Sequence, residues 1–250
     1  MNKKDLEKNN IDNLTQLFKI MGASSHCYEH EKSFNISHSW PGKLWVDYNY
    51  DENDIQTLIC KAVKEKISYT IPLWDKKDKS TLLSVKALEE NGFIVTFEQI
   101  AMALDVEAVP LPTKNNLDIQ YIGSKENINT WVQIASESFS YPINNKVIHN
   151  ISKEENIDLL LAYKEGVAVG CALVFTNSNV AGVHLVGVPS SYRGQGIAQN
   201  IMQETIAFAK REQIRYITLQ ASALGLGIYK RLGFEEQFVL KNYMKRTIQP

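Results

Sequence analysis

The chain has 250 residues, of which 44% are hydrophobic and 22% charged, and its formal net charge at pH 7 is −1. This composition is typical of a globular protein with room for two ordinary cores and argues against a disordered or fibrous chain. The first 115 residues carry 14 basic and 17 acidic side chains and the remainder 13 and 11, so no strongly basic surface for nucleic acid is expected.

The cysteines and the apolar runs indicate the compartment. Cys27, Cys60 and Cys171 are odd in number and widely spaced, which favours a reducing environment over a disulfide framework. The first ten residues are polar and charged, so no signal peptide is visible, and the longest apolar run, 167–175, is too short to span a bilayer. We expect a cytoplasmic protein with neither a membrane nor a nucleic-acid partner; the sequence makes no prediction about its oligomeric state.

The first half is predicted to alternate strands and helices up to a linker. In chain order its predicted elements are a strand over 43–48, a helix over 55–63, a strand over 67–73 and a strand that follows Gly92. Pro110 and Pro112 then interrupt the pattern, because neither a strand nor a helix continues easily through proline. We therefore place a linker over 110–114 and expect a domain on either side, 1–112 and 117–250.

The second half is also predicted to alternate strands and helices. Ser124 is expected to cap the first helix of this half, and Gly233 to end the last one in a left-handed conformation. In chain order the predicted elements are strand 117–122, helices 124–139 and 144–151, strands 158–164, 167–176 and 180–188, a helix from Ile197, strand 215–219, helix 222–232 and strand 236–245.

The most informative stretch is residues 188–198, Val-Pro-Ser-Ser-Tyr-Arg-Gly-Gln-Gly-Ile-Ala. A strand leads into a loop with Gly194 and Gly196, and a helix starts at Ile197. Glycines let the backbone approach a phosphate closely, and the first N–H groups of a helix are unpaired and point at it. Arg193 adds a positive charge. The stretch therefore predicts a binding site for a phosphorylated cofactor.

Two motifs in the second half resemble the GNAT superfamily of acyl-coenzyme-A-dependent N-acyltransferases. The family's phosphate loop follows the pattern Arg/Gln-x-x-Gly-x-Gly/Ala, which is met by Arg193, Gly196 and Ala198. Downstream, the family has a strand and then a helix with a tyrosine four residues before Gly-Phe, which is met by Tyr229, Gly233 and Phe234. The two motifs stand in the family's order with one helix between them, so the resemblance covers essentially all of residues 117–250.

The resemblance implies acetyl-coenzyme A as co-substrate. Its pyrophosphate would lie on the backbone from Gly194 to Ala198, and its pantetheine arm would pair with the exposed edge of a strand that splays from its successor. Backbone N–H groups of Val186 to Val188 would then polarise the thioester carbonyl. Tyr229 would act as general acid for the departing thiolate. The cofactor-binding residues implied are Leu185, Val186, Gly187, Val188, Arg193, Gly194, Gln195, Gly196, Ile197, Ala198, Ser222 and Tyr229.

The sequence departs from the family pattern before the tyrosine. Where the family often has asparagine seven residues before it and alanine four before it, this chain has Ser222 and Gly225. Gly225 and Gly227 weaken a helix there by about 1 kcal/mol each, so the cofactor site is expected to be less rigid. Gly187 fits either a bulge in its strand or close packing beneath a neighbouring side chain.

The general base is not fixed by the sequence. His184 lies on the strand expected beside the thioester and has a suitable pKa range, although it fits the interior of a sheet equally well. Glu137 is a second candidate, and a chain of water molecules would also serve. Cys171 lies within a strand pattern with no partner base, so direct attack by the amine is expected rather than a covalent enzyme intermediate.

A metal site is not expected. The group His26, Cys27, His30 and His38 matches no trusted tetrahedral spacing and also fits a polar loop entering a strand.

The first half repeats the end of the second at a constant offset. Gly92 and Phe93 correspond to Gly233 and Phe234, and Leu88 stands in the place of Tyr229. An internal duplication explains this, with chance matching as the competing explanation. The equivalent loop in the first half has acidic residues and no glycine, which would repel a pyrophosphate: Asp51, Glu52 and Asp54.

These observations predict two α/β (α+β) domains in the manner of a tandem GNAT protein, each a mixed, mostly antiparallel sheet flanked by helices. The N-terminal domain would be degenerate, and the C-terminal domain would transfer an acetyl group to a primary amine of a small molecule or peptide. Two alternatives remain. One is a non-catalytic acyl-coenzyme-A-binding sensor or interaction module; the other is an aminoacyl or longer-chain acyltransferase on the same fold.

Overall fold

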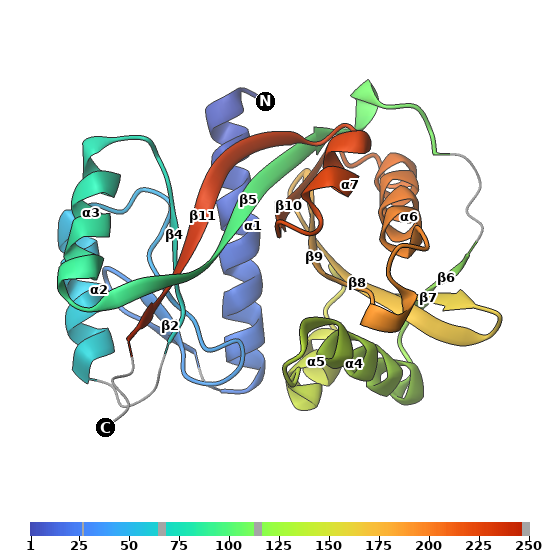
Figure 1. Ribbon diagram of the computed structural model, residues 1–250, viewed down its shortest axis with the longest axis horizontal. Helices are drawn as coiled ribbons and strands as arrows, with labels where there is room; N and C mark the ends of the chain where they lie inside the picture. The colour runs from blue at the N-terminus through green and yellow to red at the C-terminus, as the bar shows by residue number, and fades with distance from the viewer. Residues whose placement is uncertain (27, 65–68, 113–116, 247–250) are drawn as a thin grey trace. The chain divides into compact units, whose positions relative to one another are not determined.

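The computed structural model describes residues 1–26, 28–64, 69–112 and 117–246. Its contacts divide the chain into two compact units, each drawn in Figure 1. The first unit contains Met1–Ala101, Gln220–Leu224 and Glu236–Pro250, and the second contains Met102–Leu219 and Gly225–Glu235. Strand β5 (Phe93–Asp105) therefore contributes its first nine residues to one unit and its last four to the other.

The first unit places helices around short strands. β11 (Glu235–Lys245) lies between β4 (Ile71–Trp74) and β5, with Leu240 opposite Trp74 in the antiparallel pair of β11 and β4. Trp45, Trp74 and Tyr243 are almost fully buried in its core. The remaining elements are α1 (Lys3–Ser24), β1 (Tyr28–His30), β2 (Asn35–Ser37), β3 (Leu44–Trp45), α2 (Glu52–Lys64), β4 (Ile71–Trp74) and α3 (Lys79–Glu90).

Two strands predicted for this unit are shorter in the structure. The strand predicted over 43–48 is reduced to β3, because the chain turns at Asp47 to begin α2. The strand predicted over 67–73 appears as β4, and positions 67 and 68 lie outside the described residues.

The second unit is a sheet in the order β5-β10-β9-β8-β7-β6, antiparallel from β6 to β9 and parallel between β9 and β10. The predicted cap is confirmed: the side chain of Ser124 accepts from the backbone N–H of Asn127. Asn144, predicted as the first residue of the next helix, is its N-cap and accepts from the backbone N–H of Val147. Its elements are β6 (Asp118–Ile122), α4 (Lys125–Phe139), α5 (Asn145–Ile151), β7 (Ile157–Lys164), β8 (Val167–Asn177), β9 (Val180–Gly187), α6 (Ile197–Arg211), β10 (Tyr216–Ala221) and α7 (Leu226–Arg231). The predicted mixed, mostly antiparallel sheet flanked by helices is confirmed.

The last helix is much shorter than predicted. The sequence pattern placed it over 222–232, whereas α7 covers Leu226–Arg231. Gly225 stands at its N-cap without a capping side-chain hydrogen bond, and glycine favours helix weakly because it loses more backbone freedom than other residues. Gly233 has φ +93°, so the predicted left-handed stop is confirmed.

The compact units do not follow the linker at 110–114. Residues 220–224 and all of β11 after its first residue belong with the first unit, whereas residues 102–112, which precede the linker, belong with the second. The predicted boundaries, 1–112 and 117–250, describe the repeated sequence pattern and stay a prediction. Within the described residues, no helix is both long and apolar enough to cross a bilayer.

Candidate functional site

The glycine turn between β9 and α6 has the geometry that the sequence predicts. Gly194 and Gly196 both have φ +77°, a left-handed conformation that favours glycine over residues with a Cβ. A Cβ at Gly194 would meet nothing within 4 Å, so the strain of the backbone and not crowding selects glycine there. Gly196 is the N-cap of α6 and provides no side-chain cap. The N–H groups of the first turn of α6 therefore face outward without an internal partner.

Two basic side chains brace this turn. Arg193 donates from Nε to the Val188 carbonyl oxygen at 3.1 Å and from Nη2 to the Ser138 carbonyl oxygen at 3.1 Å. Lys164, at the end of β7, donates from Nζ to Oε1 of Gln195 at 2.8 Å. Arg193 thus ties the end of β9 to the last turn of α4 while remaining exposed. Arg193 therefore holds the turn in place by these hydrogen bonds and also contributes a positive charge to it.

β9 carries a bulge immediately before the turn. The register with β8 runs from Leu173 opposite His184 to Cys171 opposite Gly187, so two residues of β9 face one residue of β8. Leu185 takes the strained position, with φ +52°. On the other side of β9, pairing with β10 ends at Val183 opposite Leu219. The register with β10 does not continue into residues 185–187, as expected for a strand that splays from its successor.

Gly187 is packed closely and is not the bulge residue. A Cβ there would lie 2.9 Å from Cβ of Ser138 and 3.0 Å from Sγ of Cys171, and both distances are shorter than an ordinary van der Waals contact. The bulge lies two residues earlier, so of the two interpretations offered by the sequence, the packing one describes this glycine. Gly187 is therefore required because α4 approaches the strand at Ser138.

Cys171 is a buried structural thiol. Its Sγ donates to the Leu185 carbonyl oxygen at 3.7 Å, which holds the bulge from the neighbouring strand. Burial raises the pKa of this thiol to about 12, so it stays protonated at neutral pH and is a poor nucleophile.

Tyr229 lies on α7 and is 9% exposed. Its ring packs edge-to-face against Phe234, with centroids 5.8 Å apart, and burial raises the pKa of its phenol to about 12. No hydrogen bond joins its hydroxyl group to the residues that the structure describes. A Cβ at Gly225 would lie 2.9 Å from Cε2 of Tyr229. The glycine that departs from the family pattern is therefore the residue against which the tyrosine ring rests.

The remaining predicted site residues are more scattered. His184 is buried at 8% exposure, one residue before the bulge. Glu137 is exposed near the end of α4. Ser222 is exposed, precedes α7 and belongs to the first compact unit, so it does not share a helix with Tyr229. The structure brings together residues 185–198 as one continuous strand end, turn and helix start.

Sequence reasoning missed two residues around the turn. Ser138 sets the approach of α4, and Lys164 holds Gln195. Neither carries a sequence signal, because each acts through a neighbour that is distant along the chain. Leu185 was named as a cofactor-binding residue, but its left-handed conformation in the bulge was not predicted. Of the histidine group, Cys27 lies outside the described residues; among those described, no set of three or more His, Cys, Asp or Glu residues could hold a metal ion.

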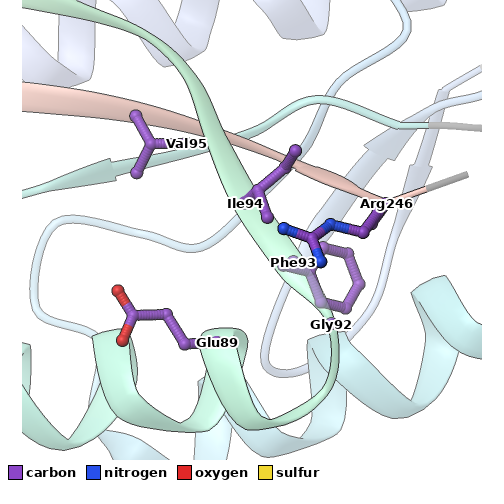
Figure 2. Close-up of a pocket in the computed structure, with 6 residues that line it drawn as sticks. All are labelled: Glu89, Gly92, Phe93, Ile94, Val95 and Arg246. Carbon is purple, nitrogen blue, oxygen red and sulfur yellow. The ribbon is translucent and has the colours of Figure 1, made fainter.

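The cavities described in this structure lie elsewhere. One of about 350 Å³ opens in the first unit (Figure 2), where Glu89 projects from α3 and Arg246 lies over Phe93. The backbone N–H of Arg246 donates to the Gly92 carbonyl oxygen at 2.9 Å. No predicted site residue lines this cavity. The candidate site is therefore the end of β9 together with the glycine turn that follows it. The residues that line the cavity are Glu89, Gly92, Phe93, Ile94, Val95 and Arg246.

Comparison with known families agrees with this geometry. Residues 122–245 match the family model described as an acetyltransferase (GNAT) domain. Residues 122–245 are therefore an acetyltransferase (GNAT) domain. The matched region begins at the end of β6 and ends at the end of β11, so it contains the bulge, the glycine turn and Tyr229.

Relatives extend the comparison in sequence and in fold. An uncharacterized N-acetyltransferase of Methanocaldococcus jannaschii is 35% identical over 69 residues, which cover 26% of this chain and only 30% of that protein. A GCN5-related N-acetyltransferase from Kribbella flavida has a TM-score of 0.70 at 14% identity and covers 95% of each chain. Another, from Sphaerobacter thermophilus, has a TM-score of 0.63 at 16% identity, covering 87% of this chain and 75% of its own. The two structures show the GNAT fold.

Proposed function

We propose that the GNAT domain transfers an acetyl group from acetyl-coenzyme A to a primary amine of a small-molecule or peptide acceptor. The observation that carries this proposal is the turn with two left-handed glycines before the uncapped start of α6. The pyrophosphate would accept hydrogen bonds from the backbone of Gly194, Gln195, Gly196, Ile197 and Ala198. The open space at Gly194 and the outward N–H groups fit such a ligand.

The strand end before the turn fits the pantetheine arm. Registered pairing with β10 ends at Val183, so the β10-facing backbone of residues 185–187 would accept an amide-containing chain in the way that a sheet edge accepts a peptide. N–H groups of Val186 to Val188, which follow the bulge, would donate to the thioester carbonyl oxygen and stabilise the charge that develops there.

Tyr229 would assist the departing thiolate. A thiol has a pKa of about 8.5, well below the value of about 12 to which burial raises the phenol of Tyr229. Full proton transfer from the phenol to the thiolate would therefore be unfavourable while the ring remains buried. We propose that Tyr229 acts mainly as a hydrogen-bond donor to the sulfur, and Ser222 as a further contact to the pantetheine.

The amine would attack the thioester directly. The protonated, buried thiol of Cys171 does not suit a covalent relay. The proton of the attacking amine would pass to His184, with Glu137 or a chain of water molecules as the other candidates. A pH–rate profile of His184→Gln compared with Glu137→Gln distinguishes these candidates, since only loss of the true base removes the acidic limb.

The first half is proposed to be a degenerate copy of the GNAT pattern. Both halves contain a strand, a loop, a helix, a strand, a helix and a strand in that order. These elements are β3-α2-β4-α3-β5 in the first half and β9-α6-β10-α7-β11 in the second. Leu88, in the place of Tyr229, is fully buried, and the first turn of α2 carries Glu52 and Asp54. This half would support the site without binding coenzyme A. We also propose a cytoplasmic location. The free thiols of Cys60 and Cys171 fit a reducing compartment of this kind.

A non-catalytic acyl-coenzyme-A sensor is the second candidate. It is favoured by the short α7 and by serine and glycine at positions 222 and 225, where the family often has asparagine and alanine. Both candidates bind acetyl-coenzyme A, but only the enzyme turns it over. A thiol-release assay with a panel of amines, and with longer acyl donors, separates these alternatives.

Calorimetric titration with acetyl-coenzyme A tests the proposal. Gly194→Glu introduces a negative charge and a Cβ into the turn and should abolish binding. Gly166→Glu is the matched control, because Gly166 has φ +78° and equally open surroundings but lies in the β7–β8 turn. Unchanged affinity in Gly194→Glu, or no binding by the wild-type protein, would contradict the proposal.

A further inference from the structure

We propose that Gly170 on β8 is a positioning residue for the cofactor site, because its lack of a side chain sets how closely the first turn of α6 approaches the sheet. The inference rests on the proposed function, since that turn would hold the pyrophosphate of coenzyme A. Gly170 is buried within β8 and lies opposite Ala162 of β7. Gly170, the glycine turn and α6 all belong to the second unit.

The contact between Gly170 and α6 is close. A Cβ on Gly170 would lie 2.8 Å from Cγ2 of Ile197 and 3.0 Å from Cδ1 of Ile201. Ile197 is the first residue of α6, Ile201 follows one turn later on the same face, and both side chains are almost fully buried. A glycine in the interior of a strand often marks such a close approach. The start of α6 therefore packs directly against the backbone at position 170.

Side-chain movement alone would not make room for a Cβ at this position. Isoleucine is branched at Cβ, and in a helix its χ1 angle has one strongly preferred value. The place of Cγ2 of Ile197 therefore follows from the backbone of the first turn. On its other side, the Cβ would lie 3.3 Å from the carbonyl oxygen of Gly187, so β9 leaves little room for β8 to shift. The first turn of α6 is consequently the part that would move.

Movement of this turn would reach the proposed pyrophosphate site directly. The side chain of Ile197 contacts Gly170, and the backbone N–H of the same residue is one of the groups that would donate to the pyrophosphate. Gly196, the N-cap of α6, has no side chain that could hold the neighbouring N–H groups in place. Hydrogen bonds to a charged acceptor weaken when their distance or angle departs from the best geometry. Gly170 would thus control affinity for the cofactor without contacting it.

Gly170→Ala tests the inference by calorimetry with acetyl-coenzyme A. The φ of Gly170 lies outside the left-handed region, so alanine can adopt the same backbone conformation and only the packing changes. We expect Kd to rise about tenfold, the scale of one lost hydrogen bond to a charged group. An unchanged Kd in folded Gly170→Ala overturns the proposal.

Two variants serve as controls for this measurement. Gly123→Ala is matched in chemistry, because Gly123 also lies outside the left-handed region and a Cβ there would meet nothing within 4 Å. Ile151→Val truncates a fully buried side chain at the end of α5 and controls for stability. Gly123→Ala should change neither Tm nor Kd, whereas Ile151→Val should lower Tm and leave Kd unchanged.

A double-mutant cycle identifies the contact that causes the effect. Ile197→Leu removes Cγ2 and keeps the volume of the side chain. Gly170→Ala should therefore raise Kd by a smaller factor when Ile197→Leu is also present. Equal factors with and without Ile197→Leu would overturn the proposal. If Gly170→Ala does not fold, the double variant should fold and bind with a Kd close to that of Ile197→Leu, and a double variant that also fails to fold overturns the proposal.

Backbone amide signals provide a readout that does not depend on the cofactor. In ¹⁵N-labelled protein, the signals of Gly196, Ile197 and Ala198 should shift in Gly170→Ala and stay in place in Ile151→Val. Unchanged signals in folded Gly170→Ala overturn the positioning role. A wild-type protein that binds no acetyl-coenzyme A overturns the proposed function, whereas these signals still decide whether Gly170 positions the turn.

Discussion

A Cβ atom on Gly225 would lie 2.9 Å from Cε2 of Tyr229, so the absence of a side chain at position 225 determines where the tyrosine ring can rest. Gly225→Ala should displace the ring and lower kcat about tenfold while the phenol remains. Gly227→Ala is the matched control: its Cβ would meet only the flexible end of Arg231 at 3.4 Å. Because alanine favours helix over glycine by about 1 kcal/mol, this second variant should raise Tm and keep kcat. Equal activity in the two variants would show that the ring position is unimportant.

Tyr229→Phe should lower kcat by about 10²-fold, the scale of a lost donor to a leaving group, with the Kd for acetyl-coenzyme A nearly unchanged. Its stability should change little, since the hydroxyl has no hydrogen bond to any residue that the structure describes. Tyr121→Phe is the control and should keep kcat. Tyr121 lies on β6, outside the proposed site, and its hydroxyl donates to Oε1 of Glu204 on α6 at 3.4 Å. Steady-state kinetics with calorimetry check this, and a fully active Tyr229→Phe would remove Tyr229 from the mechanism.

Gly187→Ala should destabilise the protein by about 1–3 kcal/mol, because its Cβ would overlap Ser138 and Cys171. Chemical denaturation measures the loss. The double variant Gly187→Ala with Ser138→Gly removes the nearer clash and should recover part of it. If the double variant is as unstable as the sum of the two single changes, α4 does not set the glycine requirement.

Burial lowers the pKa of Lys43 to about 8, and its Nζ lies 5.8 Å from the Phe18 ring centroid and 5.7 Å from that of Phe97. In the unfolded chain the pKa is about 10.4, so between pH 8 and 10.4 the unfolded state binds more protons and stability rises with pH. Lys43→Met should raise the free energy of unfolding by about 1–2 kcal/mol at pH 7. This is less than the whole pKa shift would give, because Lys43 is partly exposed and solvent screens its charge.

That gain should shrink as pH rises through the same interval. Denaturation of Lys43→Met and of the exposed-lysine control Lys86→Met at pH 7 and pH 10.5 provides the check. A gain for Lys43→Met that is independent of pH would mean that packing with the two rings, and not the buried charge, causes it.

Local signals predicted much of the second unit correctly. Ser124 caps its helix, α6 begins at Ile197 and Gly233 takes a left-handed conformation, all as predicted. These features depend on residues close together in the chain, where turn and cap chemistry determines the structure. The predicted extent of the last helix, 222–232, was wrong. Gly225 and Gly227 disfavour helix, and this effect outweighed the helical spacing of the apolar residues.

Features that depend on distant neighbours were not predictable. Three features each join segments far apart in sequence: the strained Leu185 beside Cys171, the approach of Ser138 to Gly187, and the hydrogen bonds of the Asn10 side chain with Gln220 and Gln237. A single sequence contains no direct record of such pairs. The same holds for the pairing of β11 with β4, which a division of the chain at its proline-rich linker does not suggest.

The place of β11 between β4 and β5 has a consequence for synthesis on the ribosome. The N-terminal unit is translated first, yet it lacks its middle strand until residue 245 has emerged. Its nascent form presents two open strand edges, a hazard for misassociation. Translation must therefore reach Lys245 before the earliest part of the chain can finish folding.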